Sequence, residues 1–297
     1  MAEFFSSPGI DPSSPTLSAR LRELADYLAR PMAERLTEEQ RALSLGIARR
    51  LVIEAAKSLD TEIDTGLLWS EWLDAGLPTA SRLAAACFAR AEEHRWRDHS
   101  ALRTIAPAAL SDEEGDTVDV AVTDVATKDA PEADRAYLAL QIADRRRFDG
   151  HGHPRIALAD VDPELLRALL RDIAAWRTRR PESDAAAPDD LVRRALDRRD
   201  APQGLDRAAT EYYAALDAQA AAQEAATAIS RHDWLALIAL AAAASRRSYS
   251  NMALALLSAE PAALPTLLAP LRLDHAALAP LEASLSALPG RTGEGAR

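Results

Sequence analysis

Apolar residues recur three or four positions apart along most of this 297-residue chain, and this spacing most limits what it can fold into. An α-helix has 3.6 residues per turn, so the spacing gathers these side chains on one helical face. Examples are Leu17, Leu21, Leu24 and Leu28, and later Leu165, Leu166, Leu169, Leu170 and Ile173. Alanine, the best helix former, supplies much of the 48% hydrophobic content, while aromatic residues make up only 5%. The sequence therefore predicts an all-α fold.

Breaks in this pattern divide the chain into segments. The prediction is a polar leader over 1–15, an N-terminal helical bundle over 16–110, a linker over 111–133, a C-terminal helical domain over 134–290 and a frayed tail over 291–297. The linker is acidic, and its valines fit either a strand or a short helix. The short helix is favoured, because a lone strand would have no partner in an all-α protein.

Local signals predict where individual helices begin. Thr37-Glu-Glu-Gln40 has the form of a capping box, and Asp162-Pro-Glu-Leu165 places an N-cap residue directly before a proline. One long helix is expected over 204–230. Short helices at 232–245, 249–258, 261–271 and 274–288 follow, and they predict HEAT-like stacking, although no fixed repeat period is present.

Charge and composition narrow the function classes. The net charge of −11 argues against general binding of nucleic acid or anionic membranes. The longest apolar run, Trp234–Ala244, is about half the length that spans a bilayer. The N-terminus lacks the pattern of a signal peptide, which makes the cytoplasm the expected location. Cys87 is the single cysteine, so no intrachain disulfide forms, and its apolar surroundings predict a buried thiol.

Three histidine groups are candidate sites. His151 and His153 lie in a glycine-containing loop near Asp149 and Asp160, where imidazoles and carboxylates could hold zinc or iron. An ordinary turn explains the same residues, because a histidine pair two residues apart is not a specific ligand spacing. No metal and no cofactor is therefore predicted.

His232, followed by Asp233 at the start of an apolar helix, is a candidate phosphoacceptor of bacterial signalling. His94 and His99 offer an alternative phosphoacceptor or acid–base pair. A charged helix end accounts for each of these residues equally well.

Two further groups are candidate interaction sites. Arg145, Arg146 and Arg147, with the arginines of 177–180, could form a basic patch for an acidic partner, although arginines also complement the dipole at helix C-termini. The helix from Trp234 to Ala244 has no polar face. A second copy of the chain could cover Trp234, Leu237, Leu254 and Leu257, or the neighbouring helices could cover them within one chain.

The stretch from Leu138 to Asp149, then His153-Pro-Arg-Ile156, Ala159-Asp-Val-Asp162 and Ile173-Ala-Ala-Trp176, resembles alphaproteobacterial proteins of the domain-of-unknown-function 2336 family. The Arg231-His-Asp-Trp234 helix start is similar in style to the tails of those proteins. The resemblance implies a helical bacterial protein and brings no catalytic residues with it.

Many amphipathic helices without a recognisable catalytic motif favour a non-enzymatic regulatory or scaffold protein that acts through helical surfaces on protein partners, with a homodimer as one option. A histidine-phosphotransfer-like or degenerate kinase-like signalling module is an alternative. An enzyme or small-ligand binder with a cryptic pocket is a third.

Overall fold

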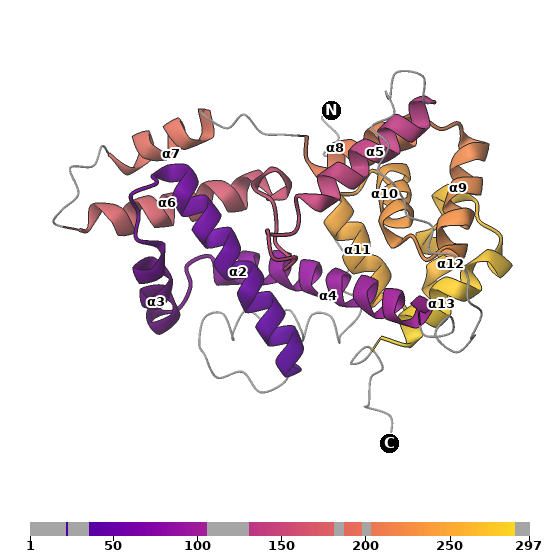
Figure 1. Cartoon of the computed structure of the whole chain (residues 1–297), viewed down its shortest axis with the longest axis horizontal. Coiled ribbons are helices and arrows are strands. Elements are labelled where there is room, and N and C mark those ends of the chain that lie inside the picture. The colour runs from indigo at the N-terminus through magenta and orange to yellow at the C-terminus, as the bar shows by residue number, and fades with distance from the viewer. Residues whose placement is uncertain (1–21, 23–35, 106–130, 181–186, 198–202, 289–297) are drawn as a thin grey trace, which may run out of the picture.

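The computed structural model describes residue 22 and residues 36–105, 131–180, 187–197 and 203–288. Every regular element in these ranges is a helix, which confirms the all-α prediction (Figure 1). HEAT-like stacking stays a prediction. The leader, the tail and residues 111–130 of the expected linker lie outside the described ranges. No helix within those ranges is long and apolar enough to cross a bilayer.

The first hydrophobic core is built from helices of both halves of the chain. Its helices are α2 (Glu38–Leu59), α3 (Thr65–Ala75), the first half of α4 (Ala80–Ile105), α6 (Pro163–Thr178) and α7 (Pro188–Asp197). The capping box before α2 is confirmed, because Thr37 Oγ1 accepts from the Gln40 amide and the Gln40 side chain returns to the Thr37 amide. Asp162 caps α6 as predicted, with Pro163 at its first position.

The second core contains the remaining elements, although Leu254 of α11 lies in the first core. They are α5 (Glu132–Arg145), α8 (Leu205–Ala214), α9 (Ala218–Ser230), α10 (Trp234–Ala244), α11 (Tyr249–Ser258), α12 (Leu264–Leu267), α13 (Ala279–Ser286) and the 3₁₀ helices η3 (Pro261–Ala263), η4 (Ala269–Leu271) and η5 (His275–Leu278). The single helix expected over 204–230 is two helices, α8 and α9. Asp217 interrupts it, because its carboxylate accepts from the Gln219 and Ala220 amides and starts α9 anew.

The two cores do not follow the predicted division of the sequence at 111–133. Helices α6 and α7, assigned by sequence to the C-terminal domain, pack against α2 in the first core. Helix α4 runs through both cores, with Leu83 in the first and Trp96 in the second (Figure 1). Helix α4 can contribute to both cores because it has 26 residues, and at a rise of 1.5 Å per residue it is long enough to pack against two sets of helices.

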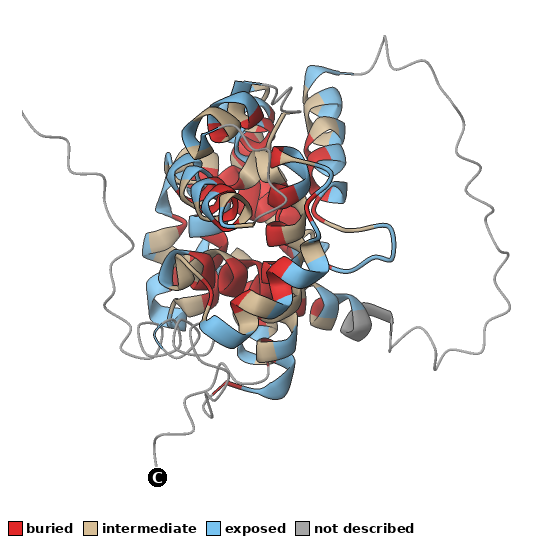
Figure 2. Cartoon of the chain, turned by 90° about the vertical axis from the view of Figure 1, so that its left-hand side faces the viewer, coloured by how far each residue is buried: buried red, intermediate tan, exposed pale blue. Residues whose placement is uncertain are grey.

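The apolar helix α10 is covered within one chain. Trp234 and Leu237 are buried against α8, α9 and α11, and Leu254 and Leu257 of α11 are buried as well. Figure 2 shows the buried residues gathered inside the molecule, beneath exposed outer helix faces. These four residues therefore provide no exposed apolar surface for a second copy, which corrects their assignment as an interaction surface. A homodimer stays a prediction without this support.

Candidate functional site: a charge cluster and pocket between the two cores

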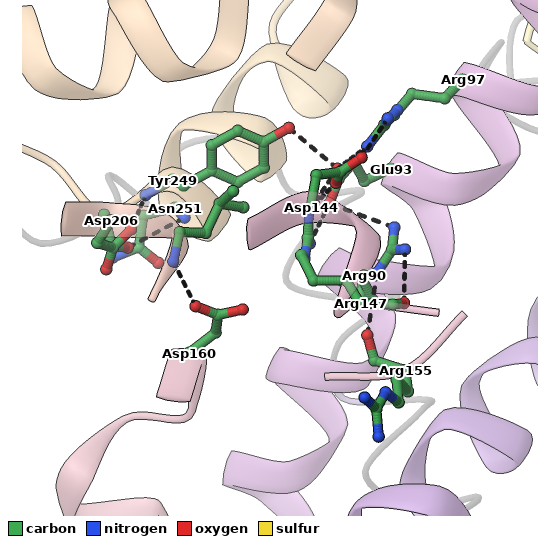
Figure 3. Close-up of polar contacts among 12 residues, drawn as sticks. Arg90, Glu93, Arg97, Asp144, Arg147, Arg155, Asp160, Asp206, Tyr249 and Asn251 are labelled. Carbon is green, nitrogen blue, oxygen red and sulfur yellow. Dashed lines mark hydrogen bonds and ion pairs between the residues drawn. The ribbon is translucent and has the colours of Figure 1, made fainter. Parts of the chain in front are cut away.

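A group of charged side chains, all buried except the partly buried Arg97, lies where the two cores meet. Helix α4 supplies Arg90, Glu93 and Arg97, the last turn of α5 supplies Asp144, and Arg147 follows that helix (Figure 3). Arg147 Nη1 lies 2.9 Å from Glu93 Oε1, and Arg147 Nη2 lies 2.5 Å from Oε2. Arg97 donates to both oxygens of Asp144, at 2.8 and 2.7 Å. The two carboxylates are thus held by bidentate guanidinium contacts.

The charges at the centre of the cluster strongly affect one another. Burial opposes ionisation of Glu93, but the guanidiniums of Arg147 and Arg90 outweigh this effect and lower its pKa well below the usual value. Burial opposes the charge of Arg147 too, and Glu93 raises the pKa of that guanidinium. Tyr249 of α11 donates from its hydroxyl to Glu93 Oε1 at 3.1 Å. Burial and the Glu93 charge raise the pKa of Tyr249.

Guanidiniums outnumber carboxylates in the ion pairs of this cluster, since Arg90, Arg97 and Arg147 pair with Glu93 and Asp144 alone among the described residues. Arg90 is 2% exposed. Its Nε and Nη2 donate to the carbonyl oxygens of Arg155 and Arg147, at 3.2 and 3.1 Å. Its Nη1 makes no hydrogen bond and lies 3.6 Å from Glu93 Oε2. Burial, and then repulsion from Arg147, lower the pKa of Arg90 to about 10.

A pocket of about 760 Å³ lies beside this cluster. Its walls come from α4, from the segment around η2 (Leu158–Asp160), from the start of α6, from the start of α8 and from the first turns of α11. Arg90 and Arg147 line one side. Asp160, Asp206 and Asn251 line another, and Figure 3 shows them opposite the arginine group. A pocket of this size is typical of small-molecule sites.

Two aspartates of the pocket each cap a helix from another part of the chain. Asp160 Oδ1 accepts from the Leu205 amide at the start of α8, at 2.6 Å. Asp206 Oδ1 accepts from the Tyr249 amide at the start of α11, also at 2.6 Å. Gly204 permits the first contact, because a Cβ there would lie 2.9 Å from Asp160 Oδ1 and 3.0 Å from the Ala159 carbonyl oxygen.

The second oxygen of each aspartate has no hydrogen-bond partner among the described residues. Burial raises the pKa of Asp160, against the lowering effect of the Leu205 amide and of Arg147. The side-chain amide of Asn251 is likewise without a hydrogen-bond partner in the described part of the chain. The pocket thus presents polar groups that can form hydrogen bonds with a bound molecule.

The histidine loop is organised by one aspartate. Asp149 accepts from the His151 and His153 amides at 2.9 Å, and its Oδ2 lies 3.3 Å from His153 Nδ1. The His151 and His153 rings are exposed, with centroids 6.1 Å apart. No group of three or more histidine, cysteine or acidic side chains is arranged for a metal ion within the described ranges. The geometry is that of a capped turn.

The candidate phosphoacceptors do not share one setting. His232 is exposed in the turn between α9 and α10 with a φ of 57°, so it lies off the helical face that its assignment assumed. Asp233 caps α10 through the Ala236 amide and accepts a hydrogen bond from the Tyr137 hydroxyl. His94 packs edge-on against the Phe148 ring, and burial lowers its pKa. His99 is half-buried on α4.

The arginine run is divided between surface and interior. Arg145 and Arg146 are exposed, whereas Arg147 is buried in the charge cluster. The prediction that Arg147 belongs to a surface patch is therefore wrong. Cys87 is buried as predicted, and burial raises the pKa of its thiol.

Sequence reasoning missed the pocket. Its one local signal is the spacing of Arg90, Glu93 and Arg97 along one side of a helix that also carries buried apolar residues. No family model, curated protein or solved structure matches the chain. The resemblance to the domain-of-unknown-function 2336 family therefore stays a hypothesis.

Proposed function

We propose that this chain is a non-enzymatic regulatory protein that binds a small polar ligand in the pocket between its two cores. The observation that carries the proposal is the pocket of about 760 Å³ beside a buried cluster with more guanidiniums than carboxylates. Binding sites of small molecules commonly combine such a cavity with a few convergent polar groups. Among the described residues that line it, none is a histidine or a cysteine.

The position of the pocket supports a regulatory role. Its lining includes Ile156, Val161 and Leu165 of the first core and Leu205 and Tyr249 of the second. A ligand that contacts both sides stabilises one arrangement of the two cores over others. The protein surface formed across their junction would then depend on the ligand.

A blocked pocket tests this function. Ala85 lines the pocket from α4 and is half-buried, so Ala85→Phe fills the space without leaving the helix. Thermal unfolding is measured with a panel of amino acids, organic acids, polyamines, sugars and nucleotides. We expect at least one compound to stabilise the wild type by about 2.7 kcal/mol at one hundred times its Kd. Ala85→Phe loses this effect, and Ala139→Phe on α5, away from the pocket, retains it. The proposal fails if no compound stabilises the wild type or if Ala85→Phe responds equally.

The outer face of α5 supports a second candidate function, the binding of an acidic amphipathic segment of a protein partner. Leu138 and Ile142 are 42% and 47% exposed and lie one helical turn apart, and Arg145 and Arg146 are exposed just beyond them. The apolar pair can contact the apolar face of such a segment, and the guanidiniums can contact its acidic face. A labelled acidic amphipathic peptide should bind at least about tenfold more weakly to Ile142→Glu than to Leu67→Glu, an exposed leucine of α3. Equal binding by both variants would contradict this role.

A further inference from the structure

The pocket is electrically polarised. On one side stand Arg90 and Arg147, part of a buried group in which three guanidiniums face two carboxylates. Screening is weak in such a buried setting, so the excess charge acts across the neighbouring space. Arg90 adds an Nη1 that makes no hydrogen bond and lies 3.6 Å from its ion-pair partner, Glu93 Oε2. This side of the pocket favours a negatively charged group.

The opposite side favours a positively charged group. Asp160 and Asp206 each use one oxygen to cap a helix, and the second oxygen has no partner among the described residues. The two carboxylates are close enough for Asp206 to raise the pKa of Asp160. An ammonium group between them would relieve this repulsion and donate hydrogen bonds to the second oxygens.

We propose that the pocket binds a zwitterionic molecule of amino-acid type, with its ammonium toward Asp160 and Asp206 and its carboxylate toward the Arg90 and Arg147 side. This inference rests on the proposed ligand-binding function of the same pocket. A ligand with one charge would match one side and leave the other unmatched. Ala89 and Leu254 add apolar lining that can contact an uncharged side chain of such a molecule.

Calorimetric titration with the twenty free amino acids tests the ligand class. For the best binder, the deaminated acid and the decarboxylated amine are titrated in parallel. We expect each analogue to bind at least tenfold more weakly than the amino acid, because each lacks one of the two charges.

Matched variants then locate the ammonium. Asp160→Asn and Asp206→Asn remove the charge but keep an oxygen that accepts the helix amide, so the caps are retained. Each should weaken amino-acid binding at least tenfold and leave binding of the deaminated acid within twofold. Asp217→Asn is the control, since the Asp217 carboxylate also accepts amides at a helix start, that of its own helix α9, and Asp217 is not among the described residues that line the pocket. It should bind as the wild type does.

The outcomes separate this inference from the proposed function. Suppose that no amino acid binds, but another compound of the stabilising panel does, and that Ala85→Phe abolishes its binding. The ligand class is then wrong and the pocket function stands. The class is also wrong if an analogue binds as tightly as the amino acid, or if both asparagine variants bind normally. If no compound depends on Ala85, both proposals fail.

Discussion

At the scale of the residue, the effect of a buried carboxylate on stability depends on whether it has a partner. Glu93 is 1% exposed and contacts three guanidiniums and the Tyr249 hydroxyl. Asp172 of α6 is different, because its Oδ2 is buried without a hydrogen bond. Opposite effects on stability follow from these two settings.

Removing the Glu93 charge should destabilise the fold strongly. In Glu93→Gln, the buried guanidiniums of Arg90 and Arg147 and the partly buried one of Arg97 would face Asp144 alone. Breaking a buried pair in this way costs roughly 3–5 kcal/mol. Urea unfolding at pH 7 measures the loss. The control is Glu164→Gln, whose 3.6 Å contact with Arg82 joins largely exposed side chains and should change stability by less than about 1 kcal/mol. A similar loss in both variants would show that burial of the cluster does not matter.

The same carboxylate predicts sensitivity to acid. The pKa of Glu93 is lowered in the folded protein from its ordinary value of 4.5. Its stabilising effect is therefore complete above pH 4.5 and is lost as the pH falls through the lower, folded-state value. The stability difference between wild type and Glu93→Gln should shrink as the pH falls below 4.5. A constant difference down to acid unfolding would contradict this linkage.

Asp172 predicts the reverse effect. Burial raises its pKa above 3.8, so the charged form is disfavoured in the folded protein. The stability cost therefore grows as the pH rises from 3.8 to the raised value and is complete above it. Asp172→Asn should stabilise the protein at pH 7 by about 0.5 kcal/mol, kept small because solvent still screens part of the side chain. The gain should disappear at pH 3. Destabilisation at pH 7 would mean that the carboxylate has a favourable role.

At the scale of the element, helix starts are fixed by carboxylates, and several of these come from distant segments. Asp162 and Asp217 cap their own helices, whereas Asp160 and Asp206 accept the first amides of α8 and α11 from other segments of the chain. The same contacts that begin these helices therefore shape the ligand site.

Gly204 tests how closely η2 must approach α8. In Gly204→Ala, the new Cβ would meet Asp160 Oδ1 at 2.9 Å and the Ala159 carbonyl oxygen at 3.0 Å, so the segments must separate. We expect a loss of roughly 1–3 kcal/mol, as for overpacking elsewhere, and faster hydrogen exchange at the Leu205 amide. Gly150→Ala is the matched control, because nothing lies within 4 Å of its Cβ position. Unchanged exchange at Leu205 in Gly204→Ala would contradict the close approach.

At the scale of the whole molecule, α4 joins the two cores. Of the five tryptophans, Trp69, Trp72 and Trp176 lie in the first core, while Trp96 and Trp234 stack in the second with ring centroids 4.8 Å apart. Unfolding one core would expose half of α4 and break the buried charge cluster, which favours cooperative unfolding of both.

Two probes of one variant test this cooperativity. In Trp96→Phe/Trp234→Phe, fluorescence reports the first core alone, whereas far-ultraviolet circular dichroism reports the helices of both. We expect the two urea transitions to coincide within error. Separate midpoints would show that the cores unfold independently.

The sequence by itself determined the helical class, several helix starts and the burial of Cys87. These features depend on alanine content, on leucine spacing and on caps such as Thr37 and Asp162, all of which act within a few residues. Two other predictions assumed that segments close in sequence pack together. The division at 111–133 does not match the two cores, and the apolar surface proposed at Trp234 is buried.

Only the tertiary structure decided the charge cluster and the pocket. Glu93 meets Arg147 across 54 positions and Tyr249 across 156, and no local pattern encodes such pairings. A buried arginine and a solvated one look alike in a sequence, as Arg147 and Arg146 do, because burial depends on which distant helices return to the same place. The helices follow from local energetics, whereas the candidate site follows from long-range packing.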